Sequence, residues 1–236
     1  MKSESSELRF FLTPEHPCSY LHDRQAKTLF LDPRETITSN MYAQLTQHGF
    51  RRSGGHLYRP QCAGCNACIP TRLKVEAFEP NRSQRRTARR NQDLRFEITT
   101  AAFSGAAFTL YERYIANRHD DGDMFPASED QFRSFLLSPW ASTYFLCGYL
   151  GTALVAVGVF DRLDNGLSAV YTFYDPRLDA RSLGTQVILE EINLTQELNL
   201  PHLYLGYWIK DSEKMRYKTN YRPVQLLVNG QWVDLR

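Results

Sequence analysis

The sequence predicts an α+β fold, with a larger C-terminal domain behind a smaller, irregular, cysteine-bearing N-terminal domain. Turn-forming residues crowd the chain as far as about residue 75, whereas alternating extended segments dominate from Ser142 onward. Residues 167–208 then read as strand, loop, helix and strand, and this order after antiparallel strands indicates a mixed domain. The chain has 236 residues, of which 42% are hydrophobic, enough for one large core or two modest ones.

The N-terminal domain is expected to contain short elements between turns. Extended segments are expected at 27–31 and 56–59, and a helix at 41–48 that ends at Gly49. Pro80-Asn81 opens a helix that runs to about Asn91, and a strand follows at 93–99. The small-residue stretch 101–105 marks the expected boundary, giving domains 1–100 and 101–236.

The C-terminal domain is expected to begin with helices at 108–118 and 129–137. Strands follow at 143–149, 152–163 and 167–174, and Leu150-Gly151 between the first two is a hairpin signal. An amphipathic helix is expected from 182–185 to about Leu198, and a further strand at 203–208.

Charge and hydropathy argue against a membrane-spanning or secreted protein and favour a negatively charged partner. No apolar run approaches the roughly 20 residues that cross a bilayer, and the N-terminus does not resemble a secretion signal, so a cytoplasmic protein is expected. Residues 1–100 carry 16 basic and 10 acidic side chains, whereas residues 101–236 carry 12 and 16. This asymmetry favours a polyanionic partner for the first half, although simple surface solvation gives the same asymmetry.

An arginine stripe explains most of the basic excess. Its five members follow the i, i+3, i+4, i+7, i+8 spacing of a single helix face: Arg82, Arg85, Arg86, Arg89 and Arg90. Guanidinium groups bind phosphate bidentately, and no acidic residue interrupts the stripe, so it predicts a helix that binds a polyphosphate, for which an RNA backbone is suited. A solvated helix paired with acidic residues of the second half is the alternative.

Four cysteines form a candidate metal site. Three stand in one short loop, at Cys62, Cys65 and Cys68, and Cys18 lies far away in sequence. Four thiolates of this kind can hold zinc or an iron–sulfur centre, although the three-in-one-loop spacing departs from the usual two separated pairs. Reduced thiols in a tight turn are the equal alternative.

Two further segments read as candidate binding sites. Residues 182–185 (Ser182, Leu183, Gly184 and Thr185) stand where a helix begins, so their N–H groups can bind an anion or a carbonyl oxygen; an ordinary cap by Ser182 is the alternative. Residues 206–223 alternate aromatic and cationic side chains, which favours contact with bases and phosphates. Its members are Tyr207, Trp208, Lys210, Lys214, Arg216, Tyr217, Lys218, Tyr221 and Arg222.

Several long motifs resemble those of one family. They occur in order at Cys18–Leu21, Tyr58–Pro70, Asn81–Arg86, Val170–Pro176, Gly206–Lys210 and Lys214–Lys218. Together they resemble the bacterial branch of the arginyl-tRNA–protein transferases. This resemblance covers nearly the whole chain. It implies a GNAT-like C-terminal acyltransferase domain and an N-degron activity, the transfer of Leu from leucyl-tRNA to proteins that begin with Asp or Glu. Eukaryotic relatives have further cysteines where this chain has Leu21 and Ala67, so their metal centre does not carry over directly.

The implied reaction is aminolysis of an aminoacyl ester, which needs no covalent nucleophile, metal or other cofactor; the aminoacyl-tRNA is a co-substrate. Asp175 is the expected group that orients or deprotonates the amine, with a capping role before Pro176 as the alternative. Tyr171 and Tyr207 are expected pocket walls or proton donors.

The remaining candidate residues are assigned to the three parts of the substrates that they are expected to bind. Residues 182–185 are expected to hold the aminoacyl-adenosine end, and Arg216, Lys218 and Arg222 the acidic N-terminus. The arginine stripe, with Lys210 and Lys214, is expected to bind tRNA. Use of arginyl-tRNA, an acyl-CoA-dependent N-acyltransferase and a non-catalytic RNA-binding module are the competing functions, and the oligomeric state is open.

Overall fold

A mixed eight-stranded sheet forms the centre of the computed structural model, which describes residues 8–235 except 121 and 123. Residues 1–7, for which the sequence predicts no secretion signal, lie outside the described part. The strands follow the order β14 (Gln231–Asp234), β13 (Val224–Val228), β7 (Ile69–Lys74), β12 (His202–Trp208), β11 (Gly166–Tyr174), β10 (Ala153–Leu163), β9 (Thr143–Leu150) and β8 (Leu94–Thr100). All neighbouring pairs are antiparallel except β11 and β12, which are parallel.

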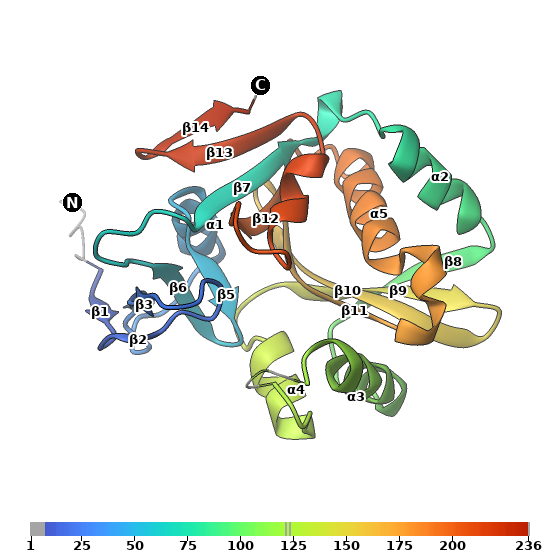
Figure 1. The fold of residues 1–236 in the computed structure, drawn as a ribbon, viewed down its shortest axis with the longest axis horizontal. Helices are drawn as coiled ribbons and strands as arrows, with labels where there is room; N and C mark the ends of the chain where they lie inside the picture. The colour runs from blue at the N-terminus through green and yellow to red at the C-terminus, as the bar shows by residue number, and fades with distance from the viewer. Residues whose placement is uncertain (1–7, 121, 123, 236) are drawn as a thin grey trace, which may run out of the picture.

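Helices cover both faces of this sheet (Figure 1). On one face lies α5 (Leu183–Glu197), with α2 (Arg82–Arg90) packed outside it. On the other face lie α3 (Gly105–Arg118) and α4 (Glu129–Leu136). Each face therefore buries its own apolar cluster, one centred on α5 and one on α3 and α4.

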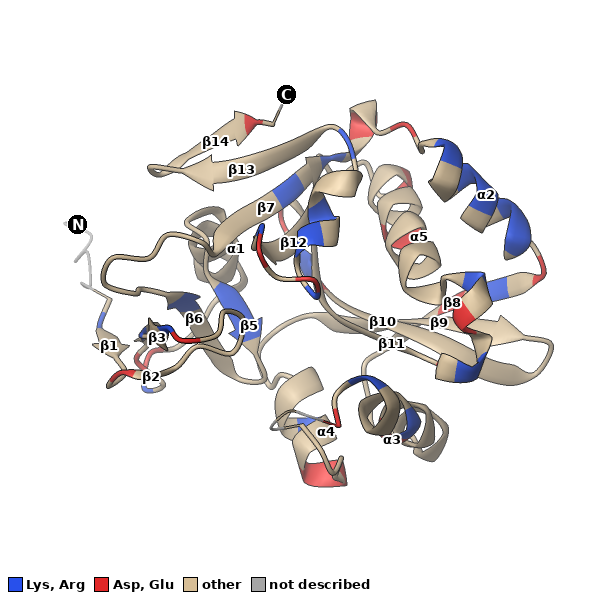
Figure 2. Ribbon diagram, in the orientation of Figure 1, with Lys and Arg blue, Asp and Glu red and all other residues tan. Residues whose placement is uncertain are grey.

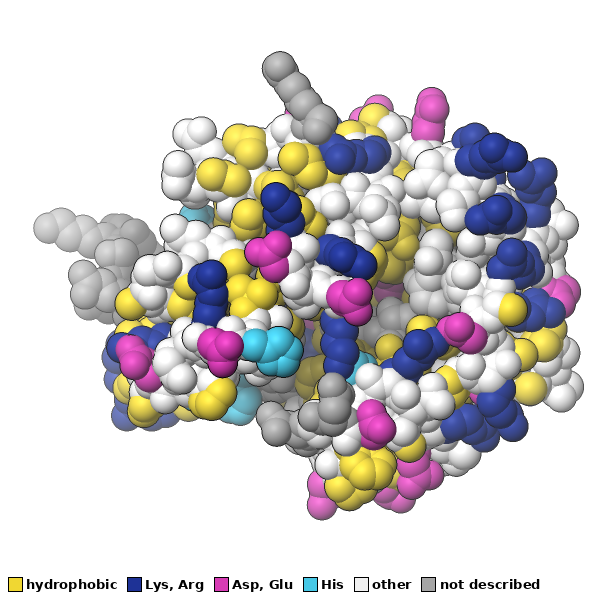
Figure 3. Space-filling model, viewed as in Figure 1, with side chains coloured by type: hydrophobic (Ala, Val, Ile, Leu, Met, Phe, Trp, Pro, Cys, Tyr) yellow, Lys and Arg dark blue, Asp and Glu magenta, His cyan; other side chains and the backbone are white. Residues whose placement is uncertain are grey.

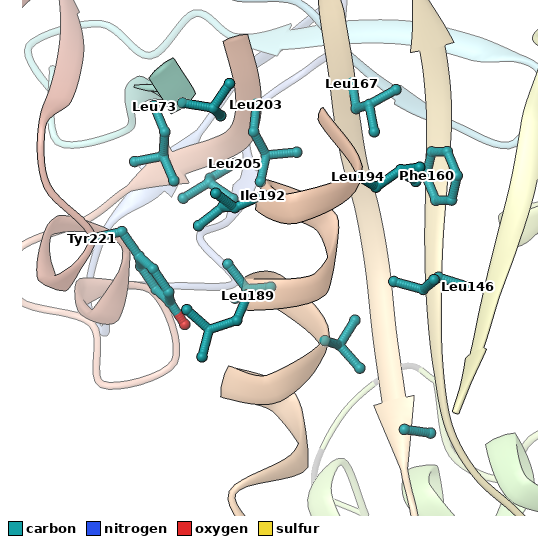
Figure 4. Close-up of a cluster of buried hydrophobic side chains, with 14 of the residues drawn as sticks. Leu73, Leu146, Phe160, Leu167, Leu189, Ile192, Leu194, Leu203, Leu205 and Tyr221 are labelled. Carbon is teal, nitrogen blue, oxygen red and sulfur yellow. The ribbon is translucent and has the colours of Figure 1, made fainter. Parts of the chain in front are cut away.

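The cluster under α5 is the larger of the two. Ile192 of α5 lies beside Leu203 and Leu205 of β12, and Leu189 lies one turn away beside Tyr221 (Figure 4). Phe160 and Leu167 come from β10 and β11. The apolar residues of α5 recur every three or four positions, which places them on the face that meets the sheet. This packing fixes the helix axis, and so fixes where its N-terminus lies.

The N-terminal module has a small sheet of its own. Its strands are ordered β1 (Phe10–Leu12), β4 (Thr28–Leu31), β6 (His56–Pro60) and β5 (Arg51–Ser53), beside a two-stranded ribbon of β2 (His16–Pro17) and β3 (Gln25–Ala26), and it carries α1 (Ser39–Gln47). A fully buried ion pair joins the module to the central sheet: Arg52 Nε lies 2.6 Å from Asp161 Oδ2. Tyr42 also donates to this carboxylate, at 2.6 Å.

The α+β class is confirmed, and so are the helices and strands expected from the sequence, with shifts of a few residues at their ends. The sequence did not predict β7, β13 or β14. The central sheet also takes β7 and β8 from before residue 101, so it crosses the expected boundary, and the division at residue 100 stays a prediction. Among the described helices, none is long and apolar enough to cross a membrane.

Candidate active site

The two parallel strands of the central sheet separate after a short contact. β11 and β12 pair only from Gly166 with His202 to Ser168 with Tyr204. Beyond that point β11 continues to Tyr174 and β12 to Trp208, and β12 is bulged where Gly206 takes a φ of 81°. The sheet is therefore open between these strands. The face seen in Figure 3 is hollowed near its centre, between the N-terminal module and the helices α3 and α5.

Arg51 of β5 fills the base of this opening. Its guanidinium donates to Ser168 Oγ at 3.0 Å, to Tyr204 O at 3.5 Å and to Ala169 O. Two of these acceptors are backbone carbonyls at the point where strand pairing stops, so Arg51 supplies donors that a neighbouring strand would otherwise supply. A side chain at Gly206 would place its Cβ 3.3 Å from Arg51 Nε. The small module thus provides the floor of a cleft in the large sheet.

Two buried ionisable groups near the opening form no ion pair with any residue that the structure describes. Glu191 of α5 is fully buried, and Lys218 of the short 3-10 helix η3 (Arg216–Asn220) is 4% exposed. The Lys218 ammonium contacts Met215 Sδ at 3.3 Å and lies 4.7 Å from the Tyr217 ring centroid. Burial lowers the pKa of Lys218 to about 7, with a smaller contribution from Arg51. Burial also raises the pKa of Glu191 to about 8, and Arg51 partly opposes that shift.

Asp175 occupies the capping position that the sequence left as the alternative. Its side chain accepts from Arg177 N at 3.1 Å at the start of a 3-10 helix, η2 (Pro176–Arg181). Arg177 Nη2 lies 2.7 Å from the carboxylate and Arg113 Nη1 lies 2.9 Å from it. The hydrogen bonds from Arg177, helped by the charge of Arg113, hold the pKa of Asp175 below its ordinary value. Such a carboxylate is a poor proton acceptor, and the role of Asp175 in deprotonating the amine stays a prediction.

Tyr171 and Tyr207 each contact neighbouring groups of the fold. Tyr171 packs among the aromatic rings below α3, with its hydroxyl 3.9 Å from Met124 Sδ. Tyr207 is 3% exposed and donates to Gly49 O at 2.8 Å, so it ties β12 to the N-terminal module. Both contacts are structural, and the proposed catalytic roles of these two tyrosines stay predictions.

The N-terminus of α5 borders the opening, but Ser182 does not cap it. Ser182 has a left-handed φ of 54° and makes no side-chain capping bond. The first N–H groups of a helix have no acceptor within it, so those of Leu183 and Gly184 remain available to a ligand. The Tyr174 ring lies against Gly184, where a Cβ would stand 3.2 Å from Tyr174 Cε1. Thr185 follows within the first turn.

The arginine stripe is exposed on α2, as Figures 2 and 3 show. Among the described residues, none of its five guanidinium groups forms an ion pair with a carboxylate, so the paired-helix alternative does not hold. The opposite face of α2 is polar and docks on both sides of the opening. Gln84 Nε2 donates to Asn220 O at 3.2 Å, at the end of η3, and Asn91 Nδ2 donates to Arg181 O at 2.8 Å, just before α5.

The other basic candidates of the C-terminal segment point outward. All four are exposed, namely Lys210, Lys214, Arg216 and Arg222, and Lys214 and Arg222 have partners. Arg216 Nη2 lies 3.4 Å from Glu213 Oε1, and Arg222 Nη1 donates to Leu235 O. Of the three residues expected to recognise an acidic N-terminus, only Lys218 is buried against the opening.

The cysteines gather at one end of the N-terminal module. Burial and the nearby thiols of Cys18, Cys62 and Cys65 raise the pKa of Cys68 to about 12. Arg24 Nη1 lies 3.5 Å from Cys65 Sγ, and Lys27 N lies 3.5 Å from Cys62 Sγ. Across the described part of the chain, no three His, Cys, Asp or Glu side chains are arranged to hold a metal ion. The thiols therefore do not fit a metal centre as they lie here, and the zinc or iron–sulfur centre stays a prediction.

Sequence reasoning missed Arg51 and Glu191. Arg51 stands in a short strand, and only the fold brings it to residues 168–204. Glu191 did carry a signal, because it stands on the same helix face as Val187, Ile188 and Leu194 and interrupts their apolar pattern. A charged residue at such a position is seldom buried without a partner.

Known proteins resemble this chain over almost its whole length. The sequence models described as "Arginine-tRNA-protein transferase" match it at residues 16–86 for the N terminus and 106–228 for the C terminus. Proteins named aspartate/glutamate leucyltransferase are 51% identical in Hahella chejuensis, over 97% of both chains, and 52% identical in Pseudomonas fluorescens strain Pf0-1, over 99% of both. That of Alcanivorax borkumensis is 51% identical over 98% of this chain and 96% of its own. These matches cover nearly the whole chain, and the chain belongs to the arginine-tRNA-protein transferase family.

Proposed function

We propose that this protein transfers leucine from leucyl-tRNA to the N-terminal Asp or Glu of other proteins, and so marks them for degradation. The observation that carries the proposal is the opening between β11 and β12, where a buried ammonium without a carboxylate partner lies beside an exposed basic helix. The names of the relatives support the same reaction and favour leucine as the donor amino acid.

Lys218 is suited to recognise an acidic N-terminal side chain. Within the described part of the chain, the partners of this buried ammonium are a thioether sulfur and an aromatic ring, which compensate its charge poorly, and an entering carboxylate would compensate it. The carboxylate would also raise the depressed pKa of Lys218, so binding is coupled to uptake of a proton near neutral pH. Arg216 and Arg222 can contribute only from the surface.

The tRNA is proposed to lie along α2, with its 3′ end at the opening. The five arginines face solvent, while the polar face of α2 contacts the segments on both sides of the cleft. A phosphate backbone held on α2 is thereby placed close to the α5 N-terminus. There the N–H groups of Leu183 and Gly184 can hold the ester carbonyl as negative charge develops on its oxygen. Lys210 and Lys214 extend the basic surface.

A transfer assay tests the proposal. Purified protein is mixed with radiolabelled leucyl-tRNA or arginyl-tRNA and with peptides that differ only in their first residue, Asp, Glu or Ala. Label is expected on the Asp and Glu peptides from leucyl-tRNA alone. The family models carry the name of arginine, so label from arginyl-tRNA would assign that donor instead. No label from either tRNA would contradict the proposal.

The same assay tests the role of Lys218. Lys218→Met keeps the length and packing of the side chain but removes its charge. We expect the KM for the Asp peptide to rise by roughly tenfold or more, as for loss of a charge-assisted contact, with tRNA binding unchanged. Arg216→Met, two residues away on the surface, is the matched control. An equal effect of both variants would place acid recognition elsewhere.

A further inference from the structure

Glu191 is a buried carboxyl group without a partner. It lies in the middle of α5 with no exposed surface, and neither carboxylate oxygen accepts a hydrogen bond from any described residue. Its apolar neighbours on the same helix face are Val187, Ile188 and Leu194. An ionisable group in such surroundings weakens the fold, because its charged form is poorly solvated and its neutral form has no hydrogen-bond partner. Packing alone gives no reason for a glutamate here.

The charged and titratable groups that face Glu191 do not neutralise it. Arg51 is the cation close enough to act on it, but its guanidinium is already bonded to Ser168, Ala169 and Tyr204. Tyr217 and Tyr221 are the other titratable groups close enough for Glu191 to influence them, and both are uncharged at neutral pH. Glu190 on the same helix is engaged elsewhere, with Gln186 and Asn193.

The opposite strand makes room for this carboxyl. A Cβ at Gly158 of β10 would stand 3.0 Å from Glu191 Oε1 and 2.6 Å from Val187 Cγ1. Any larger residue would push the carboxyl aside. Gly158 pairs with Thr172 of β11, and Thr172 lies beyond Ser168, the last residue of β11 that pairs with β12. The Glu191 carboxyl therefore lies over the stretch of the sheet that borders the opening.

We propose that Glu191 is the proton acceptor for the α-ammonium group of the incoming protein N-terminus. This inference rests on the proposed function. An N-terminal Asp or Glu carries one cation, its α-ammonium, and one anion, its side-chain carboxylate. The opening offers an unpartnered carboxyl and an unpartnered ammonium, both within the electrostatic reach of Arg51. The two unpaired groups thus match the two charges of the acceptor.

The proposed step balances in protons and electrons. The α-ammonium gives one proton to the Glu191 carboxylate, leaving a neutral amine and a carboxylic acid. The amine lone pair attacks the ester carbonyl carbon, the new C–N bond forms, and the C–O bond to the ribose breaks. The second proton lost by nitrogen goes to the departing ribose oxygen, which leaves as an alcohol. Glu191 then releases its proton to solvent.

The acidities of the two groups suit this exchange. A protein α-amino group has a pKa of roughly 7.7–8, and burial raises the pKa of Glu191 to about 8. Proton transfer between groups of similar pKa is nearly balanced in free energy, which is the condition under which a general base works best near neutral pH.

A pH profile of Glu191→Gln tests the proposal. Gln is isosteric with the protonated carboxyl and should fold, which a melting curve checks. With saturating leucyl-tRNA and an Asp peptide, we expect the single-turnover rate at about pH 7 to fall on the order of 100-fold. The deficit should shrink toward about pH 9.5, where the amine is neutral without help, after correction for spontaneous ester hydrolysis. Glu190→Gln is the matched control and should behave as the wild type.

The outcomes distinguish a failure of the proposed transfer function from a failure of the proposed role of Glu191. No transfer by the wild-type protein would overturn the proposed function itself. Transfer by the wild type with an equal rate and pH profile in Glu191→Gln would overturn the role of Glu191 alone. A deficit that is constant at every pH would assign Glu191 a structural role and overturn it as well. Gly158→Ala, which displaces the carboxyl without removing it, is expected to give the same pH-dependent deficit.

Discussion

At the scale of single residues, Glu191 and Lys218 give the free energy of unfolding an unusual dependence on pH. Glu191 has its pKa raised from 4.5 to about 8, so the folded state binds more protons and stability is lost as the pH rises across that interval. Lys218 has its pKa lowered from 10.5 to about 7, so stability is regained as the pH rises from about 7 to about 10.5.

Urea unfolding at a series of pH values should therefore show a minimum in the free energy of unfolding between about pH 7 and pH 8. Each group contributes a slope of up to about 1.4 kcal/mol per pH unit. Glu191→Gln should remove the slope on the acid side, and Lys218→Met the slope on the alkaline side. A free energy of unfolding that does not change with pH in the wild type would contradict the shifted pKa values of both groups.

The sequence predicted residues whose role depends on a local pattern. The five arginines of α2 were visible because helix periodicity alone places them on one face. Asp175 was ambiguous, because the same aspartate before a proline suits a cap or a base, and the structure places it in the cap. Arg51 could not be predicted, since its acceptors lie more than 100 positions away, at Ser168, Ala169 and Tyr204.

At the scale of elements, α2 is a helix that packs through hydrogen bonds more than through apolar contacts. Asn81 and Gln84 form a capping box at its start, and its buried residues are Gln84 and Thr87. The arginines contribute little to this packing because they face solvent. Their spacing instead places five positive charges on one helix face. These charges repel one another and destabilise the helix, so bound anions that neutralise them stabilise it.

Replacing Arg85, Arg86 and Arg89 by Ala should weaken tRNA binding and reduce its dependence on salt. Each lost phosphate contact lowers the slope of log K against log salt by roughly 0.7–0.9. The free energy of unfolding should change by less than about 0.5 kcal/mol per site. Filter binding over a salt series measures the first quantity and urea unfolding the second. An unchanged salt slope would assign the stripe to the fold.

Some strands of the central sheet could not be predicted because their sequence departs from what a central strand normally contains. β7 contains Pro70, which normally argues against a central strand, but β7 pairs with β13 only at residues 71–73, beyond the proline. β13 and β14 did carry a clear signal, since Asn229-Gly230 is a typical two-residue hairpin turn and both residues have positive φ. That pair of strands was predictable and was missed.

At the scale of the whole molecule, the buried pair of Arg52 and Asp161 holds the N-terminal module on the central sheet. Neither side chain has exposed surface, and Asp161 also accepts from Tyr42 and Thr143. Arg52→Ala would leave this carboxylate buried without its cation. We expect a loss of about 3–5 kcal/mol in the free energy of unfolding.

The matched control is Arg95→Ala, which removes the exposed pair with Glu97. Such pairs contribute about 0–1 kcal/mol. Both variants are compared by urea unfolding. Equal effects would mean that the module is held by its apolar contacts, such as the Tyr42–Trp140 edge contact, and not by the ion pair.

Arg51 has a consequence for how the protein is made. Translation produces this guanidinium early, but its carbonyl acceptors, Ala169 and Tyr204, emerge only late in the chain. A nascent chain that stops before β12 contains Arg51 and β11 but lacks the second strand that borders the opening. The opening is therefore completed only when nearly all of the polypeptide has left the ribosome. Truncated translation products should be inert, and cannot attach degradation signals to the wrong proteins.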